Sequence, residues 1–192
     1  MGNTVGSLTS TQKSIVIGSI IGDGSLRRAS GRKNALLEVN HSFDYKEYVD
    51  WKYDKLKDIV ITPPKPRRGN EGRVAYRFTT RSIPEITELY NKFYANGRKF
   101  IPSDIKLDPL VMAVWFMDDG SKSYKSLYLN TQRFNSEDQK ILMDKLFKQW
   151  NILSSLNKDK IYYRIRISVD STPKFKRIIS SFILPIFAYK LM

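Results

Sequence analysis

The spacing of apolar positions changes along the chain, and each change predicts a different element. After Asp44 the positions expected to be buried follow a helical period: Tyr45, Tyr48, Val49, Lys52, Leu56 and Ile59. Residues 161–169 instead alternate strictly, which predicts a strand. Its core face would carry Ile161, Tyr163, Ile165, Ile167 and Val169, and its open face Tyr162, Arg164, Arg166 and Ser168. Residues 73–79 alternate in the same way, with arginines on the open face.

The predicted elements form two successive series that run in the same order. The first series is a helix at 12–22, extended segments around 25–30 and 35–42, a helix from 44, a strand at 73–80 and a helix at 82–94. The second is a helix at 109–117, a strand at 124–131, a helix at 136–150, a strand at 161–169 and a helix from 172. An internal duplication is the simplest account. We therefore expect a flexible lead-in at 1–11, a first half at 12–104 and a second half at 105–192.

Each series opens on an apolar helix that ends in an acid, a glycine and a serine. Ile21-Gly22-Asp23-Gly24-Ser25 in the first series corresponds to Met117-Asp118-Asp119-Gly120-Ser121 in the second. Positions four apart on each helix would let the two helices pack closely: Gly18, Gly22, Ala113 and Met117. Their ends would then bring Asp23 and Asp119 together, and two close carboxylates repel unless a divalent cation lies between them.

Composition restricts the partners and the chemistry. The 192-residue chain has 33 Lys plus Arg, 19 Asp plus Glu and a net charge of +14, which favours a polyanionic partner such as DNA, RNA or an anionic membrane. No apolar run approaches the ~18 residues of a membrane span. The chain has no cysteine and one histidine, His41, which we expect to make a structural hydrogen bond on its strand. A metal would therefore be held by oxygen ligands, which suits Mg²⁺, Mn²⁺ or Ca²⁺.

Arginine, asparagine and glutamine on the open strand faces are candidates for reading DNA bases, because Arg pairs with guanine and Asn or Gln with adenine. The residues assigned to base reading are Glu38, Asn40, Arg73, Arg77, Tyr128, Asn130, Gln132, Arg164, Arg166 and Ser168. Loop cations are assigned to DNA binding through phosphates, which adds affinity without sequence information: Arg27, Arg28, Arg32, Lys33, Lys65, Arg67 and Arg68. Lys122 is also assigned to DNA binding. The ordinary alternative is that exposed strand faces are simply charged.

Residues 16–24 and 112–120 resemble the two signature helices of LAGLIDADG homing endonucleases, in the single-chain branch that carries both motifs. The resemblance runs from about Ser14 to the C-terminus, and the form Trp-Phe-Met-Asp-Asp-Gly at 115–120 is particularly specific. Three further segments resemble family segments near the active site: 96–102, 129–132 and 183–190.

The resemblance implies an α+β fold of two pseudo-symmetric halves, whose antiparallel sheets form a saddle over DNA with the signature helices at the interface. It implies that Asp23 and Asp119 bind Mg²⁺, helped by the carbonyls of Gly22 and Asp118, with Mn²⁺ able to substitute and Ca²⁺ binding without cleavage. Lys99 and Lys190 would act beside the phosphate. The implied reaction is hydrolysis of both strands of a long asymmetric target, leaving short 3′ overhangs.

Two other functions remain open: a maturase that assists splicing of a group I intron RNA, and a regulator that binds DNA without cutting. The presence of both acids favours the endonuclease. We expect an intron-encoded monomer that acts on double-stranded DNA, with no membrane partner. It would work in a mitochondrion or chloroplast, or otherwise in a microbial cytoplasm, and would not be secreted.

Overall fold

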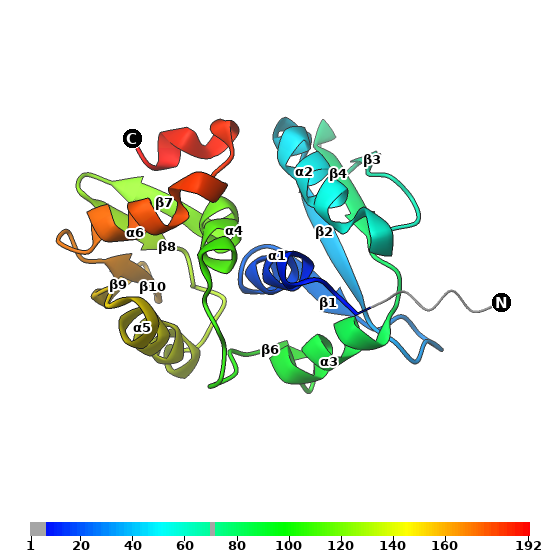
Figure 1. The fold of residues 1–192 in the computed structure, drawn as a ribbon, viewed down its shortest axis with the longest axis horizontal. Coiled ribbons are helices and arrows are strands. Elements are labelled where there is room, and N and C mark those ends of the chain that lie inside the picture. The colour runs from blue at the N-terminus through cyan, green and yellow to red at the C-terminus, as the bar shows by residue number, and fades with distance from the viewer. Residues whose placement is uncertain (1–6, 70–71) are drawn as a thin grey trace. The chain divides into compact units, whose positions relative to one another are not determined.

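A computed structural model describes residues 7–69 and 72–192 of the chain. The chain divides into two compact units, one up to Lys92 and one from Phe93. Each unit contains a four-stranded antiparallel sheet with helices packed on one face (Figure 1). The α+β class expected from the sequence is confirmed.

The first unit begins with a helix whose start is fixed by Thr9. The Thr9 hydroxyl accepts from the Gln12 backbone N–H while the Gln12 side chain accepts from the Thr9 N–H, which is a capping box. The described elements of this unit are α1 (Ser10–Ile21), β1 (Ser25–Arg27), β2 (Leu36–Ser42), η1 (Phe43–Tyr45), α2 (Lys46–Leu56), η2 (Lys57–Ile59), β3 (Lys65–Arg68), β4 (Val74–Thr79) and α3 (Pro84–Phe93). The predicted lead-in is therefore wrong for residues 10–11, which are helical, and its residues 1–6 lie outside the described part of the chain.

The first sheet has the strand order β1-β2-β4-β3, and every pairing in it is antiparallel. Alternate positions of β2 and β4 are buried against α2, while the intervening polar positions face the other way. The buried residues shared by this sheet and α2 include Leu37, Val39, Tyr48, Val49, Leu56, Tyr76 and Phe78. Of the helical stripe predicted after Asp44, five positions are confirmed as buried and the first, Tyr45, is only half-buried: Tyr48, Val49, Lys52, Leu56 and Ile59 are the buried ones.

The second unit follows the same plan. Its described elements are β5 (Tyr94–Ala95), β6 (Arg98–Lys99), α4 (Pro109–Asp119), β7 (Gly120–Ser123), β8 (Ser126–Leu129), α5 (Ser136–Trp150), β9 (Ser154–Asp159), β10 (Tyr162–Ile167), α6 (Thr172–Ile179), η4 (Ser180–Phe182) and η5 (Pro185–Lys190). The four-stranded sheet has the order β7-β8-β10-β9, which repeats the order of the first sheet. The repeated topology agrees with an internal duplication.

The strand registers align the two copies residue by residue. Ser25 pairs with Glu38 in the first unit, and its counterpart Ser121 pairs with Tyr128 in the second. Glu38 and Tyr128 therefore occupy equivalent places. Counting the same number of residues onward from Glu38 and from Tyr128, the start of α2 at Lys46 corresponds to the start of α5 at Ser136.

Several elements were not predicted from the sequence. The strand β3 lies in a segment that was expected to be a loop, and no strand was predicted for β7, β9 or the short hairpin β5–β6. The predicted core face of β10 is also only partly correct. Ile165 and Ile167 are fully buried, whereas Ile161 and Val169 are exposed outside the two ends of the strand and Tyr163 is exposed near its start.

The packing boundary falls earlier than the expected boundary of the repeat at 104–105. The segment after β6 is tied to α5 of the second unit: the Ile101 N–H donates to Asp138 Oδ1 at 2.7 Å, and the Leu107 N–H donates to Gln149 Oε1 at 2.8 Å. These bonds place residues 93–104 with the second unit by contact. The halves 12–104 and 105–192 remain a prediction about the repeat.

Candidate active site and nucleic-acid interface

Asp23 follows the C-cap of α1, Gly22, where the backbone turns back into β1. The Gly24 N–H donates to the Ser19 carbonyl at 2.7 Å, and a Cβ on Gly24 would lie 2.8 Å from that oxygen. Only glycine fits this return of the chain over the last helical turn. The Asp23 side chain is 42% exposed. The fold thus presents its carboxylate to solvent at a fixed point.

The second motif ends in the same way. The Gly120 N–H donates to the Phe116 carbonyl, and a Cβ on Gly120 would overlap that oxygen and the Phe116 ring. Asp119 forms an ion pair with Arg133, with Nη2 at 3.1 Å from Oδ2, and its side chain is only 12% exposed. Arg133 was not predicted from the sequence, because nothing in the spacing indicates that its loop returns to the end of α4.

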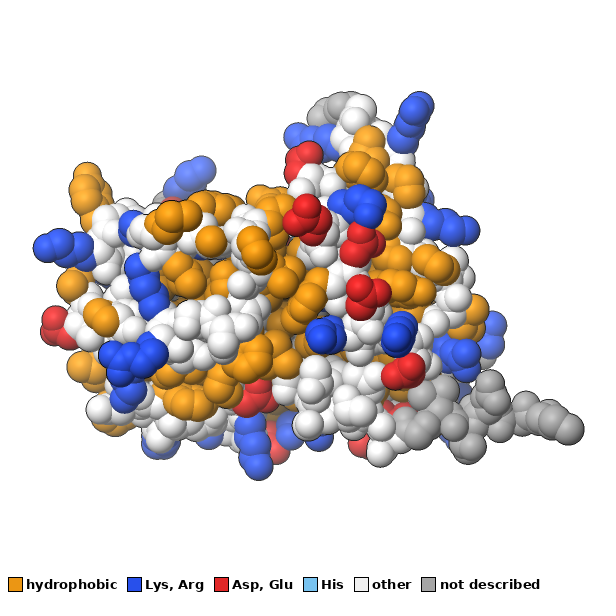
Figure 2. All heavy atoms as spheres, turned by 45° about the horizontal axis from the view of Figure 1, so that its top comes forward, with side chains coloured by type: hydrophobic (Ala, Val, Ile, Leu, Met, Phe, Trp, Pro, Cys, Tyr) orange, Lys and Arg blue, Asp and Glu red, His pale blue; other side chains and the backbone are white. Residues whose placement is uncertain are grey.

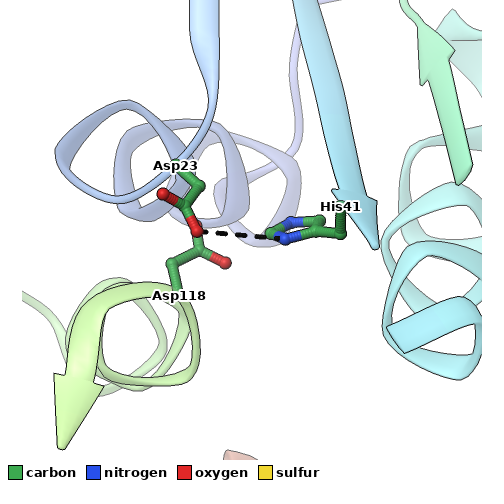
Figure 3. A group of neighbouring side chains, drawn as sticks. All are labelled: Asp23, His41 and Asp118. Atoms are coloured by element: carbon green, nitrogen blue, oxygen red, sulfur yellow. Dashed lines mark ion pairs between the residues drawn. The ribbon is translucent and has the colours of Figure 1, made fainter. Parts of the chain in front are cut away.

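His41 of β2 faces the helical layer rather than the open face of its sheet. Its Nδ1 lies 4.0 Å from Asp23 Oδ2, and its side chain is only 9% exposed (Figure 3). The ring also packs against Tyr48 at 5.2 Å between centroids. The sequence predicted only a structural role for His41. The structure also places its ring next to the acid of the first motif. Asp118, drawn in the same figure, is the penultimate residue of α4.

The two candidate lysines belong to different elements of the second unit. Lys190 Nζ donates to the Met117 carbonyl at 2.7 Å and lies 4.9 Å from the Phe187 ring centroid. This bond holds Lys190 at the end of α4, beside the acids of the second motif. Lys99 lies in β6, paired with Tyr94 of β5.

The open face of the first sheet carries most of the residues assigned there. Asn40, Arg77 and Lys65 are neighbours across three strands, and Glu38 lies next to Thr79. Arg27 forms an ion pair with Glu38 at 3.1 Å. A groove of about 410 Å³ on this face is lined by Arg27, Glu38, Thr62, Pro63, Lys65, Pro66, Arg67, Arg77, Phe78 and Thr79. Arg73 precedes β4 on the same alternation, and Arg32 and Lys33 are exposed in the loop before β2.

The open face of the second sheet holds its arginines in place. The Arg164 guanidinium lies 4.2 Å from the Tyr128 ring centroid, and its Nη1 donates to Asn130 Oδ1 at 3.4 Å. Arg166 Nε donates to Ser126 Oγ at 3.1 Å. Since both side chains are half-buried, they project from the sheet in restricted positions.

Some assigned residues lie elsewhere. Lys122 pairs with the fully buried Leu127, so it points to the helical side, and its Nζ contacts the Met192 carbonyl. Arg68 pairs with Val74, whose side chain alternates with the open-face residues, so it too points to the helical side. Both residues therefore lie in unpredicted strands, whose alternation sets their direction, and their assignment to DNA binding stays a prediction.

Three further residues that were assigned to DNA binding have polar partners within their own unit. Arg28 donates to Asn91 Oδ1 at 3.3 Å and lies over the Tyr90 ring, which ties it to α3. Ser168 Oγ accepts from the Ser171 N–H at 3.2 Å in the turn before α6. Gln132 Nε2 donates to Asp159 Oδ2 at 2.8 Å. Asp159 lies at the end of β9, and the unpredicted edge strand thus adds polar residues to this surface.

The comparisons identify the family. The model of the LAGLIDADG DNA endonuclease family matches residues 13–175, and the chain belongs to this family. None of the described helices is both long and apolar enough to cross a lipid bilayer.

Individual relatives are similar over nearly the whole chain. Cytochrome b mRNA maturase bI2 of Debaryomyces hansenii is 30% identical over 92% of this chain and 72% of its own length. Probable intron-encoded endonuclease 1 of Wickerhamomyces canadensis is 29% identical over 96% of this chain and 85% of its own length. The solved structure of the homing endonuclease I-WcaI bound to its DNA recognition sequence is 28% identical, with a TM-score of 0.90 over 97% of this chain and 88% of that one.

Proposed function

We propose that this chain is a site-specific homing endonuclease that hydrolyses both strands of a long, asymmetric DNA target and leaves short 3′ overhangs. The observation that carries the proposal is the repeated helix end. In each unit an aspartate lies at or just beyond the end of a signature helix, Asp23 two residues after α1 and Asp119 as the last residue of α4, and the following glycine packs directly on the last helical turn. Family membership and the likeness to the DNA-bound I-WcaI support the same activity.

The donor set suits a hard divalent cation. The candidate ligands are the carboxylates of Asp23 and Asp119 with the carbonyls of Gly22 and Asp118, and oxygen ligands of this kind select Mg²⁺, with Mn²⁺ as a substitute. Asp23 presents an accessible carboxylate, whereas Asp119 is held by Arg133. Arg133 would have to share or release Asp119 when a cation binds. A bound Mg²⁺ would lower the pKa of a coordinated water and stabilise the leaving oxygen.

The chain's own residues supply the rest. Lys190, held at the end of α4, would stabilise the charge that develops at the phosphate, and Lys99 would act in the same way for the first motif. The open sheet faces would read the two halves of the target. Each face can cover roughly one ~10 bp turn, which gives a site of about 20 bp. We further propose an intron-encoded monomer that works in an organelle or a microbial cytoplasm.

The acids provide the direct test. Asp23→Asn and Asp119→Asn should each abolish cleavage in Mg²⁺ and leave DNA affinity in Ca²⁺ within about threefold, because the acids add little attraction to phosphate. Cleavage in Mg²⁺ would be measured by sequencing the products of a randomised duplex library. DNA affinity in Ca²⁺ would be measured by gel shifts on the target site recovered from that library. Asp118→Asn is the matched control, since it removes the neighbouring charge. If Asp118→Asn abolished cleavage and Asp119→Asn did not, the roles of the two acids would be exchanged.

A maturase is the second candidate, and one observation favours it: the Debaryomyces hansenii relative is named as an mRNA maturase. Tight, salt-sensitive DNA binding without any cleavage in the library would favour a non-cutting regulator. Selective binding and splicing of a group I intron RNA, retained in Asp119→Asn, would instead support the maturase.

A further inference from the structure

The first unit buries a lysine completely. Lys52 of α2 has no exposed surface, and lysine is almost never buried to this extent unless it is paired. Its ammonium lies 3.5 Å from His41 Nε2 and 4.3 Å from the Tyr48 ring centroid. His41 in turn reaches toward Asp23. The three residues thus form a series that runs from the interior of the unit to the acid of the first motif.

The second unit shows that the fold does not need this lysine. When α2 and α5 are aligned at their first residues, Lys46 and Ser136, Leu142 of α5 takes the position of Lys52. Leu142 is also fully buried. The same alignment places Thr131 at the position of His41. An apolar residue therefore fills the equivalent interior position, where burying it costs no charge desolvation. The lysine and the histidine are present together in one copy and absent together from the other.

The contact with Lys52 determines which imidazole nitrogen carries the proton. An ammonium group has donors and no acceptor, so at this contact Nε2 of His41 is the acceptor. In a neutral ring the proton then lies on Nδ1, the nitrogen that faces Asp23 Oδ2. At 4.0 Å this contact is longer than a hydrogen bond, and a small rotation of the accessible Asp23 side chain would close it.

We propose that Lys52 is a positioning residue that acts through His41 to orient the Asp23 carboxylate. The proposal rests on the function proposed for Asp23. It assigns His41 as a donor to the carboxylate, and a ring protonated at Nδ1 offers no lone pair there to a metal. Partners of this kind behind a ligand commonly contribute about 10–100-fold to metal affinity or activity.

The tautomer of His41 can be measured directly, because the chain contains one histidine. Long-range ¹⁵N–¹H correlation spectra of the metal-free, DNA-free protein, recorded at a pH at which the imidazole is neutral, should show its proton on Nδ1. Lys52→Leu, which copies the second unit, should lose that preference. Lys52→Met serves the same purpose if the leucine variant does not fold. A wild-type ring protonated at Nε2 would overturn the proposal and leave Nδ1 available as a metal ligand.

Coupling between the residues tests the effect on Asp23. Ca²⁺ affinity of the complex with target DNA, measured by calorimetry, should fall about tenfold in Lys52→Leu and in His41→Thr. The double variant should be no weaker than His41→Thr, because Lys52 acts only through the ring. Leu142→Ala is the control for lost packing, and it should leave Ca²⁺ affinity unchanged. Additive losses in the double variant would contradict the proposal. Absence of cleavage by the wild type would contradict the endonuclease and leave the tautomer result intact.

Discussion

At the scale of single residues, the two motif glycines explain why each acid is followed by glycine. The chain leaves α1 and α4 by folding back on the last turn, and the space beside Ser19 and Phe116 admits no side chain at the next position. The glycine is therefore a packing requirement that fixes where the aspartate points.

Gly120→Ala should destabilise the second unit by about 1–3 kcal/mol, because the new methyl group overlaps the Phe116 carbonyl and ring. Urea unfolding followed by circular dichroism would measure the change. Gly69→Ala is the matched control, since the nearest atom to its Cβ is the Arg73 carbonyl oxygen at an ordinary 3.5 Å. Equal stability losses in the two variants would show that the close approach at Gly120 is not what requires glycine.

The sequence predicted the motif residues themselves but not the side chains that contact them. Both acids and their glycines were identified from the repeat, because the pattern lies within one continuous segment. The partners of those acids were not, since Arg133 and Lys190 reach the end of α4 from other parts of the chain. Lys52 was placed in the buried stripe, yet its contact with His41 depends on how α2 lies on β2. Side-chain partners of this kind are fixed by tertiary packing.

At the scale of elements, the sequence predicted the helices, the central strands and the edge strand β1, and missed the other edge strands β3, β7 and β9. β9 has the sequence Ser-Ser-Leu-Asn-Lys-Asp, and all four residues of β3 are exposed. Edge strands pair on one side only and are often polar, which discourages pairing with other chains. They therefore lack the alternation that identifies a half-buried strand. Both edges nonetheless direct side chains onto the candidate DNA-binding faces.

The two central arginines allow the sheets to be compared. Arg77 lies beside Asn40 on the first sheet, and Arg164 donates to Asn130 on the second. Arg77→Ala and Arg164→Ala should each weaken binding by about 1–3 kcal/mol, and each should relax base preference in only one half of the target. Binding selections on libraries randomised in either half would measure this. Uniform weakening across all sequences would instead make these arginines phosphate contacts.

At the scale of the whole molecule, the chain carries a net charge of +14, and within the first unit its charged side chains are unevenly arranged. Acidic side chains occur on and beside α2, on the helical side of the sheet: Asp44, Glu47, Asp50, Asp54 and Asp58. Figure 2 shows acidic and basic side chains mixed on the face that it presents. The open face of the same sheet carries Arg27, Lys65, Arg67 and Arg77. A polyanion would therefore be attracted to the sheet side of this unit.

This asymmetry predicts which lysines and arginines set the salt dependence of binding. The logarithm of DNA affinity should fall linearly with the logarithm of salt concentration, with a slope of about −0.9 for each phosphate contacted. Replacing the exposed loop residues Arg32 and Lys33 by alanine should make the slope shallower by about 1.8.

The matched control replaces Lys55 and Lys57, which are also exposed but lie at the end of α2 and in η2. Both double variants lose two positive charges, so an equal change of slope would mean that total charge governs binding. A change confined to the Arg32 and Lys33 variant would place the phosphate backbone at that loop, because counterions are released only where the cations meet the DNA.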